Sequence, residues 1–199
     1  ALYSLLFEKK ILNKDQISSF EKQGTKLLGH PVKNLDNGIE FSTGSLGMGL
    51  SIGSGIAIAL KKKSISKKVY VLLGDGECNE GSVWEAAIYC SSTNLENLTA
   101  IIDNNGLQQT GSNKEILDTS DLGEKWRSFG WNVLEIDGHS IPEIDDAFNK
   151  KFNNNKPKLI LAKTIKGKGV SFFENDNKWH HSILSNSLYE EAISEIEKL

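Results

Sequence analysis

Residues 69–77 read Val-Tyr-Val-Leu-Leu-Gly-Asp-Gly-Glu, an apolar run followed by an aspartate between two glycines. An apolar run of this length predicts an inner strand of a parallel sheet, because such strands are buried on both faces. Glycines after a strand let a ligand approach the backbone, and ligands of open α/β sheets bind at the carboxyl ends of the strands. Asp75 is therefore expected where a cation or a phosphate group binds.

The next predicted strand also ends in a polar turn. Residues 81–92 have the apolar periodicity of a helix, and residues 98–102 form a second apolar run. This run leads into Asp-Asn-Asn-Gly-Leu at residues 103–107. The strands of a right-handed βαβ unit end at the same edge of the sheet. Asp75 and Asn105 are therefore expected to adjoin at this edge.

The rest of the chain alternates between helix and strand patterns. Two short helices are expected in residues 1–22 and a loop in residues 24–44. Further elements are expected over residues 118–130 (helix), 132–137 (strand), 140–152 (helix) and 158–164 (strand). Ser187 is expected to cap a last helix that buries Tyr189, Ala192, Ile193 and Ile196. This order predicts an α/β protein with an open, mostly parallel sheet flanked by helices in three layers.

Small residues dominate residues 45–60, which contain four glycines. Glycine costs up to about 1 kcal/mol per position in a helix, so this pattern indicates close approach by another backbone or a cofactor. A dinucleotide fingerprint needs Gly-x-Gly-x-x-Gly, but Ile52 and Ile58 occupy the positions of the third glycine. The pattern disfavours an NAD site and predicts a buried helix that opens with glycines.

Length and charge limit the class of protein. The chain has 199 residues and a formal net charge of -3, which fits one domain over residues 1–199 and gives no field that attracts nucleic acid or an anionic membrane. Cys78 and Cys90 lack metal-ligand spacing and suit a reducing compartment. The longest apolar run, residues 52–60, is too short to span a bilayer. A cytoplasmic protein without nucleic-acid or membrane partners is expected.

The polar groups at the two strand ends suit a magnesium site. Mg²⁺ prefers about six oxygen ligands, a few from the protein and the rest from phosphates and water. Asp75, the Asn105 amide and a backbone carbonyl of residues 105–107 would supply the protein ligands. The amides of Gly74 and Gly76 are placed to face a phosphate group. Gly-Asp-Gly alone is at least as often an ordinary turn, so the pairing with Asn105 carries this prediction.

The motifs together resemble those of the transketolase family. Asp75, followed 30 positions later by Asn105, resembles the thiamine diphosphate motif. Further resemblance is carried by residues 42–49 (Ser-Thr-Gly-Ser-Leu-Gly-Met-Gly), 80–86 (Glu-Gly-Ser-Val-Trp-Glu-Ala), 163–171 (Lys-Thr-Ile-Lys-Gly-Lys-Gly-Val-Ser) and 179–180 (Trp-His). The resemblance covers nearly the whole chain. It implies a three-layer thiamine diphosphate-binding fold and, within the family, the amino-terminal domain that binds the diphosphate (the PP domain).

The resemblance also implies roles for individual residues. The implied metal ligands are Asp75, Asn105 and the carbonyl of Leu107, around Mg²⁺ or its substitutes Ca²⁺ and Mn²⁺. The residues implied to contact thiamine diphosphate are Gly44, Leu46, Gly74, Asp75, Gly76, Glu77, Asn105, Leu107 and His180. Gly76 and Glu77 are expected to lie against the diphosphate, and Gly44 and Leu46 to line the site through the glycine-rich turn.

Two histidines are implied to be catalytic. His30, in a Gly-His-Pro context, resembles the histidine near the reacting carbon, and His180 resembles the one that reaches the diphosphate and the active centre. An imidazole donates hydrogen bonds to sugar hydroxyls and moves a proton during carbon–carbon cleavage. A histidine outside such motifs is more often structural. The motifs are the reason to expect a functional role here.

The implied activity is transfer of a two-carbon ketol group from a ketose or ketose-phosphate donor to an aldose acceptor. Family members carry a further histidine just before the position of Ala1, so a short amino-terminal segment is expected to be missing. The glutamate that acts on the aminopyrimidine belongs to a pyrimidine-binding domain, which this sequence does not contain. We therefore expect a split transketolase that is active only with a separate carboxyl-terminal subunit, as two copies of each chain (α2β2).

Two other functions fit part of the pattern. A 2-oxoacid dehydrogenase E1-type subunit or a deoxyxylulose-phosphate synthase fragment would share the thiamine diphosphate motif, but residues 80–86 and 179–180 count against both. A cofactor-binding or assembly module without catalysis would keep the fold and lose the site. The presence of Asp75, Asn105, His30 and His180 counts against that module.

Overall fold

The computed structural model describes residues 1–119 and 121–198, which form two compact units, Ala1–Leu46 and Gly47–Leu199. Two residues named in the sequence predictions lie outside the described residues. One is residue 120, within the helix expected over 118–130, and the other is Leu199, the last residue of the expected domain.

The smaller unit consists of short helices around a small apolar core. Its elements are the helices α1 (Leu2–Glu8) and α2 (Lys14–Ser18) and the 3₁₀ turn η1 (Leu35–Asn37). A reciprocal capping box starts α2, because Asn13 and Gln16 each accept a backbone N–H from the other with their side chains. The buried core residues are Leu6, Leu12, Leu27 and Ile39. The two short helices and the loop expected from the sequence are confirmed.

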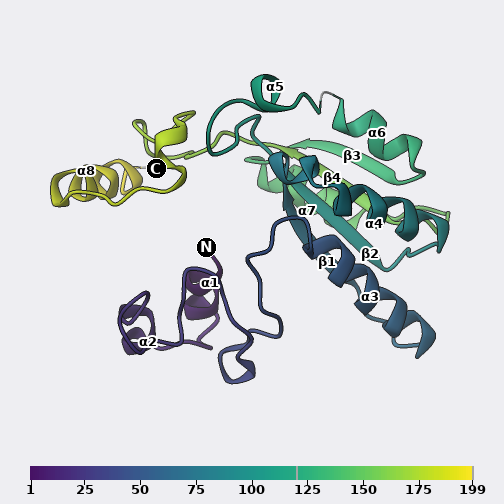
Figure 1. The fold of residues 1–199 in the computed structure, drawn as a ribbon, viewed down its shortest axis with the longest axis horizontal. Coiled ribbons are helices and arrows are strands. Elements are labelled where there is room, and N and C mark those ends of the chain that lie inside the picture. The colour runs from purple at the N-terminus through teal and green to yellow at the C-terminus, as the bar shows by residue number, and fades with distance from the viewer. Residues whose placement is uncertain (120, 199) are drawn as a thin grey trace. The chain divides into compact units, whose positions relative to one another are not determined.

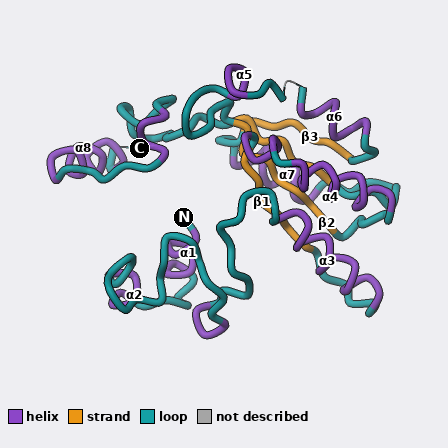
Figure 2. Tube along the Cα trace, in the orientation of Figure 1, coloured by secondary structure: helices purple, strands orange, loops and turns teal. Residues whose placement is uncertain are grey.

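The larger unit contains a four-stranded parallel sheet (Figure 1, Figure 2). Its strands are β1 (Val69–Gly74), β2 (Leu98–Asn104), β3 (Asn132–Asp137) and β4 (Lys158–Lys163), in the order β1-β2-β4-β3. All three strand pairs are parallel. The register places Gly74 opposite Asp103, so the ends of β1 and β2 adjoin as the βαβ argument predicts. The predicted fold class, an open parallel sheet flanked by helices, is confirmed. The prediction that residues 69–73 form an inner strand buried on both faces is wrong, because β1 lies at an edge of this sheet and Tyr70 and Leu72 are 50% and 72% exposed.

Helices cover both faces of this sheet. The helical elements of the larger unit are α3 (Gly49–Lys62), η2 (Gly76–Asn79), α4 (Gly81–Ser92), α5 (Asn113–Ile116), α6 (Leu122–Ser128), α7 (Ile141–Asn149), η3 (Asn177–His180) and α8 (Asn186–Ile196). Side chains of α3, α4 and α6 join Val71 and Leu73 of β1 in one core cluster. Tyr70 alternates with Val71 and contacts Phe148 of α7 on the other face.

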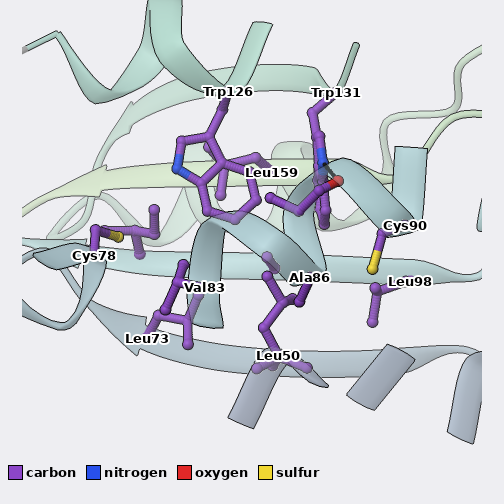
Figure 3. Close-up of a cluster of buried hydrophobic side chains, with 14 of the residues drawn as sticks. Leu50, Leu73, Cys78, Val83, Ala86, Cys90, Leu98, Trp126, Trp131 and Leu159 are labelled. Atoms are coloured by element: carbon purple, nitrogen blue, oxygen red, sulfur yellow. Dashed lines mark hydrogen bonds between the residues drawn. The ribbon is translucent and has the colours of Figure 1, made fainter. Parts of the chain in front are cut away.

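Tryptophans fill the core between α4 and α6 (Figure 3). Trp126 is fully buried and packs edge-on against Trp131, with ring centroids 4.7 Å apart. The indole N–H of Trp131 donates to the Ala87 carbonyl of α4 at 2.9 Å. These contacts fix α4, and α4 follows directly on the turn that carries Asp75.

Glycines let α3 lie close to β1. A Cβ atom at Gly53 would overlap Val71 Cγ2, whereas a Cβ at Gly55 would meet no atom within 4 Å. The glycine pattern predicts close approach by another backbone or a cofactor. At Gly53 the close neighbour is instead the Val71 side chain of β1. Gly49 also lies against this strand, because its Cβ would be 3.5 Å from Val71 Cγ1.

This difference between the two glycines gives a first prediction. Gly53→Ala should lower the free energy of unfolding by about 1–3 kcal/mol, because the added methyl overpacks the contact with Val71. Gly55→Ala is the matched control and should raise it by about 0.5–1 kcal/mol, because alanine forms helix more readily than glycine. Urea unfolding of both variants measures the two changes. Equal responses would contradict the packing account.

The carboxyl-terminal helix differs from its prediction. Its cap is Ser185, whose hydroxyl accepts the N–H of Leu188, and not Ser187. Ala192 is buried as expected, but the expectation is wrong for Tyr189, Ile193 and Ile196, which are 56%, 37% and 51% exposed. The helix is tied to the rest of the unit through Glu195, whose carboxylate accepts the backbone N–H and the hydroxyl of Ser171. Among the helices of residues 1–119 and 121–198, none has the length and apolar character needed to cross a membrane.

Candidate cofactor and metal site

Asp75 lies where β1 ends beside β2. Its backbone N–H continues the strand pairing by donating to the Asp103 carbonyl at 3.1 Å, and its side chain turns back to cap η2. One carboxylate oxygen accepts the N–H of Gly76 at 2.7 Å and the other accepts the N–H of Gly106 at 2.5 Å. Asp75 and the turn after β2 are thus joined directly, as their spacing predicts.

The surroundings of Asp75 suit a cation. The residue is only 2% exposed, and it takes part in none of the ion pairs found within residues 1–119 and 121–198. A buried carboxylate without a counter-charge is costly, and a bound cation would offset that cost. The described part of the chain contains no cluster of three or more His, Cys, Asp or Glu that would hold a metal unaided. One carboxylate completed by neutral oxygens and ligand phosphates fits Mg²⁺.

Residues 106–113 form a narrow hairpin that presents further oxygens. The N–H of Asn113 donates to Gly106, and the N–H of Gln108 donates to Gly111. The carbonyl of Leu107 therefore stays outside this ladder, and no hydrogen bond to it is found within the described residues. Asn105 shapes the turn, since its side-chain oxygen accepts the N–H of Leu107 at 2.9 Å. Both predicted neutral ligands thus lie in the turn that contacts Asp75.

The Glu77 carboxylate bridges two backbone segments. One oxygen accepts the N–H of Gly47 at 2.9 Å and the other accepts the N–H of Gly74 at 3.1 Å. Ser82 adds a third contact by donating its hydroxyl to the Gly47 carbonyl at 3.0 Å. Glu77 therefore holds the turn before α3 against the end of β1. This bridging function has no counterpart in the sequence pattern.

Gln108 is a further residue of this region, and the sequence predicts no role for it. A Cβ at Gly76 would lie 2.7 Å from Gln108 Cγ, so the second glycine of Gly-Asp-Gly lets the hairpin approach η2. The Gln108 amide nitrogen is buried and finds no hydrogen-bond partner in the part of the chain that the structure describes. The only sequence signal for Gln108 is its place in the turn after Asn105.

His180 lies at the end of η3, which is held by aromatic contacts. Trp179 packs against Phe172 and Phe173, with centroids 5.5 and 4.9 Å away. Asn177, with its amide oriented to satisfy both groups, donates to the Gln108 carbonyl and accepts the Gly111 N–H, each at 3.1 Å. The segment with His180 is thereby attached to the hairpin that follows Asn105.

The ring of His180 faces a lysine. Lys166 Nζ lies 3.0 Å from His180 Nδ1. Partial burial, then the charge of Lys166 and that of His181, lower the pKa of His180 below its ordinary value. Because the pKa of His180 is lower in the folded chain than in the unfolded chain, this residue contributes its full share of folding stability only above its ordinary pKa. That contribution is lost as the pH falls through the lower, folded-state pKa.

A substitution at Lys166 tests this electrostatic effect. Lys166→Met should raise the pKa of His180 compared with the unmodified chain, because a nearby positive charge is removed. The value should stay below the ordinary one, since burial is the largest cause of the shift and remains. An NMR titration of the ring protons gives the result. A pKa that stays the same or falls would contradict the assignment.

The smaller unit holds the remaining predicted site residues. His30 and Gly44 are neighbours, because a Cβ at Gly44 would lie 3.0 Å from the His30 ring, and the φ of Gly44 is +131°. The Thr43 N–H donates to the Pro31 carbonyl at 2.9 Å and fixes this pairing. Leu46 is 59% exposed. Position 44 thus requires glycine for two reasons: its φ is positive, and a Cβ atom there would crowd the His30 ring.

The sequence matches a family model and named proteins. The family is transketolase, thiamine diphosphate binding domain, and the match covers residues 1–196. The chain is 42% identical over 197 residues to an apulose-4-phosphate transketolase subunit of Phocaeicola vulgatus, covering 98% of this chain and 70% of that protein. It is 38% identical over 199 residues to a 6-deoxy-6-sulfo-D-fructose transketolase subunit of a Clostridium species, covering 100% and 72%.

Solved transketolases share the fold. The Campylobacter jejuni transketolase superposes with a TM-score of 0.85 at 30% identity, over 92% of this chain and 30% of that one. The Pichia stipitis transketolase in complex with sedoheptulose 7-phosphate gives a TM-score of 0.85 at 29% identity, over 98% and 31%. The chain thus spans about a third of these transketolases and most of the subunit relatives. It belongs to the transketolase family of transferases, as the thiamine diphosphate-binding domain at the amino-terminal side.

Proposed function

We propose that the chain is the amino-terminal subunit of a two-chain transketolase, which transfers a two-carbon ketol group from a ketose or ketose phosphate to an aldose. The observation that carries this proposal is the buried Asp75 carboxylate, which has no counter-charge among the described residues and adjoins the turn of Asn105. The relatives named as transketolase subunits support the same interpretation.

The residues after β1 and β2 would hold the cofactor through its metal. Asp75 would bind Mg²⁺ with its carboxylate, and Asn105 and Leu107 would add an amide and a carbonyl oxygen. Ca²⁺ or Mn²⁺ would replace Mg²⁺ with the same oxygens. The N–H groups of Gly74 and Gly76, expected to face a phosphate, instead donate to the Glu77 and Asp75 carboxylates, so these glycines would lie beside the diphosphate without donating to it. Thiamine diphosphate, when bound, supplies the stabilisation of negative charge on carbon that ketol transfer needs.

Histidines would handle hydrogen bonds and protons. A lowered pKa keeps the His180 ring neutral at neutral pH, so it has one donor and one acceptor nitrogen. Lys166 at 3.0 Å adds a positive charge that would attract a phosphate group. His30 would serve the reacting carbon. These roles are general acid–base and binding roles, and they need no chemistry beyond proton transfer.

A second chain would complete the enzyme. Three relatives of this chain are named as transketolase subunits, and the human transketolase is matched over only 31% of its length at 38% identity. We infer that a carboxyl-terminal subunit supplies the pyrimidine-binding domain and its glutamate. Two copies of each chain in the cytoplasm are the proposed arrangement.

Reconstitution tests the proposal. The chain is mixed with the product of a neighbouring reading frame that encodes a pyrimidine-binding domain, and ketol transfer is assayed with a panel of ketose phosphates and aldoses. Activity should require both chains, thiamine diphosphate and Mg²⁺. Activity of the chain alone would contradict the two-chain arrangement. Cofactor binding by the mixture without transfer to any acceptor would indicate a binding module instead of an enzyme.

A further inference from the structure

The turn after β3 contacts the segment that leaves β4. This β4 exit segment, residues 163–169, carries the Lys-Thr-Ile-Lys-Gly-Lys-Gly motif. His139, at the end of that turn, accepts the backbone N–H of Ile165 with its Nε2 atom at 2.8 Å. The two residues are 26 positions apart in the sequence, so the bond joins separate parts of the fold.

The turn itself is fixed on the sheet. The N–H of His139 donates to Asp137 Oδ1 and the N–H of Gly138 donates to the Lys163 carbonyl, both at 2.8 Å. A Cβ at Gly138 would lie 2.5 Å from Thr164 Cγ2, so only glycine permits this approach. The His139 ring therefore starts from a backbone with a set position.

The β4 exit segment is held differently on its two sides. Toward β2, Thr164 donates its N–H to the Asn104 carbonyl at 3.1 Å and its hydroxyl to the Asp103 carboxylate. Toward the turn after β3 there is a cavity of about 710 Å³, whose lining includes Asp137, His139, Glu143, Lys163 and Ile165. At the rim of this cavity, the hydrogen bond from the Ile165 N–H to His139 Nε2 joins the exit segment to the turn.

The position of Ile165 determines where Lys166 lies. Lys166 Nζ is 3.0 Å from His180 Nδ1, and its carbonyl accepts the N–H of Asn175 at 3.0 Å. The segment is thus fastened at Thr164, at Ile165 and at Lys166, and His139 supplies the middle contact.

We propose that His139 is a positioning residue that holds the β4 exit segment, through the N–H of Ile165, so that Lys166 faces His180. Its significance for catalysis rests on the proposed function, because His180 is a predicted catalytic residue. As an acceptor, Nε2 carries no proton, and the ring is the neutral tautomer with hydrogen on Nδ1. His139 needs no contact with substrate or cofactor for this role.

Three substitutions of His139 in the full chain distinguish a hydrogen-bonding role from a role of side-chain volume alone. His139→Ala removes the acceptor. In His139→Gln the side-chain oxygen reaches about as far as Nε2, and in His139→Asn it is one bond too short. Ile141→Ala, at the first residue of α7 and 74% exposed, is the control. Two readouts are taken without cofactor, namely NMR hydrogen exchange of the Ile165 amide and the ring titration of His180.

We expect the Ile165 amide to exchange roughly twofold to tenfold faster in His139→Ala and His139→Asn, the range for loss of one hydrogen bond. The pKa of His180 should rise in the same two variants, because Lys166 is no longer held beside it. His139→Gln and Ile141→Ala should match the unmodified chain. If His139→Ala does not fold, the comparison of the glutamine and asparagine variants still decides.

Three results would overturn the proposal. These are equal behaviour of the glutamine and asparagine variants, an unchanged His180 titration in a folded His139→Ala, and a ring proton on His139 Nε2 in the unmodified chain. Because these readouts need no cofactor, they can fail while thiamine diphosphate still binds. Conversely, if the complex did not bind thiamine diphosphate, the proposed function would fail, but the finding that His139 holds Lys166 beside His180 would still stand.

Discussion

Asp75→Asn should weaken Mg²⁺-dependent binding of thiamine diphosphate by about 100-fold or more. Changing groups that merely support a metal ligand costs about 10–100-fold, and Asp75 is the only charged ligand proposed for this site. The substitution removes the negative charge that would hold the cation. It also turns an amide NH₂ toward the N–H of Gly76 or Gly106, where the carboxylate oxygens now accept.

The matched control for this prediction is Asp103→Asn. Asp103 lies opposite Gly74 on β2, and its carboxylate is bonded to the Thr164 hydroxyl. The control removes one negative charge from the same edge of the sheet without touching the proposed ligands. Calorimetric titration of the two-chain complex should show near-normal affinity for the control. Equal losses in both variants would mean that net charge, and not ligation by Asp75, determines binding.

Gly47→Ala should lower the free energy of unfolding of the chain by about 2–4 kcal/mol. Gly47 has a φ of +81°, and a Cβ there would lie 2.6 Å from Glu80 Cβ and 2.7 Å from Ser82 Oγ. The strain of a left-handed backbone is thus added to a clash with atoms close to the main chain. The turn would have to move away from Glu77, which bonds its N–H.

Two other glycines serve as references for this effect. Gly106 has a φ of +77° but no atom within 4 Å of an added methyl, so Gly106→Ala should show only the backbone strain, about 1–2 kcal/mol. Gly81→Ala meets neither strain nor a neighbour and should be close to neutral. Denaturant unfolding ranks the three variants. The account is contradicted if Gly47→Ala is no more destabilising than Gly106→Ala.

The strands were predictable because their signal is local. Residues 69–73 and 98–102 are short runs of mainly apolar residues, and such runs predict strands. Burial on both faces was predicted correctly only for the second run, because β1 lies at the edge of the sheet with Tyr70 and Leu72 exposed. The close approach to α3 at Gly53 was predictable because glycine costs helix stability, whereas Gly55 has no such neighbour. The contact between Asp75 and the turn of Asn105 followed from the connection of neighbouring parallel strands.

The bonds that organise the site could not be predicted, because they join a side chain to a distant backbone group. Glu77 binds Gly47 from 30 residues away and His139 binds Ile165 from 26 away, and neither distance produces a periodic pattern. The cap of α8 was misplaced because serines at 185 and 187 offer the same side chain. The apolar side of α8 predicted burial, but only Ala192 of that helix is buried.

The most direct test of the account is a calorimetric titration of thiamine diphosphate into the complex of this chain with its partner subunit. One titration contains Mg²⁺ and the other contains a chelator of divalent cations. We predict saturable binding with Mg²⁺ and none with the chelator, because the buried Asp75 carboxylate would repel a diphosphate that arrives without a cation. Equally tight binding in both titrations, or no binding in either, would contradict the assignment of this strand end as the cofactor site.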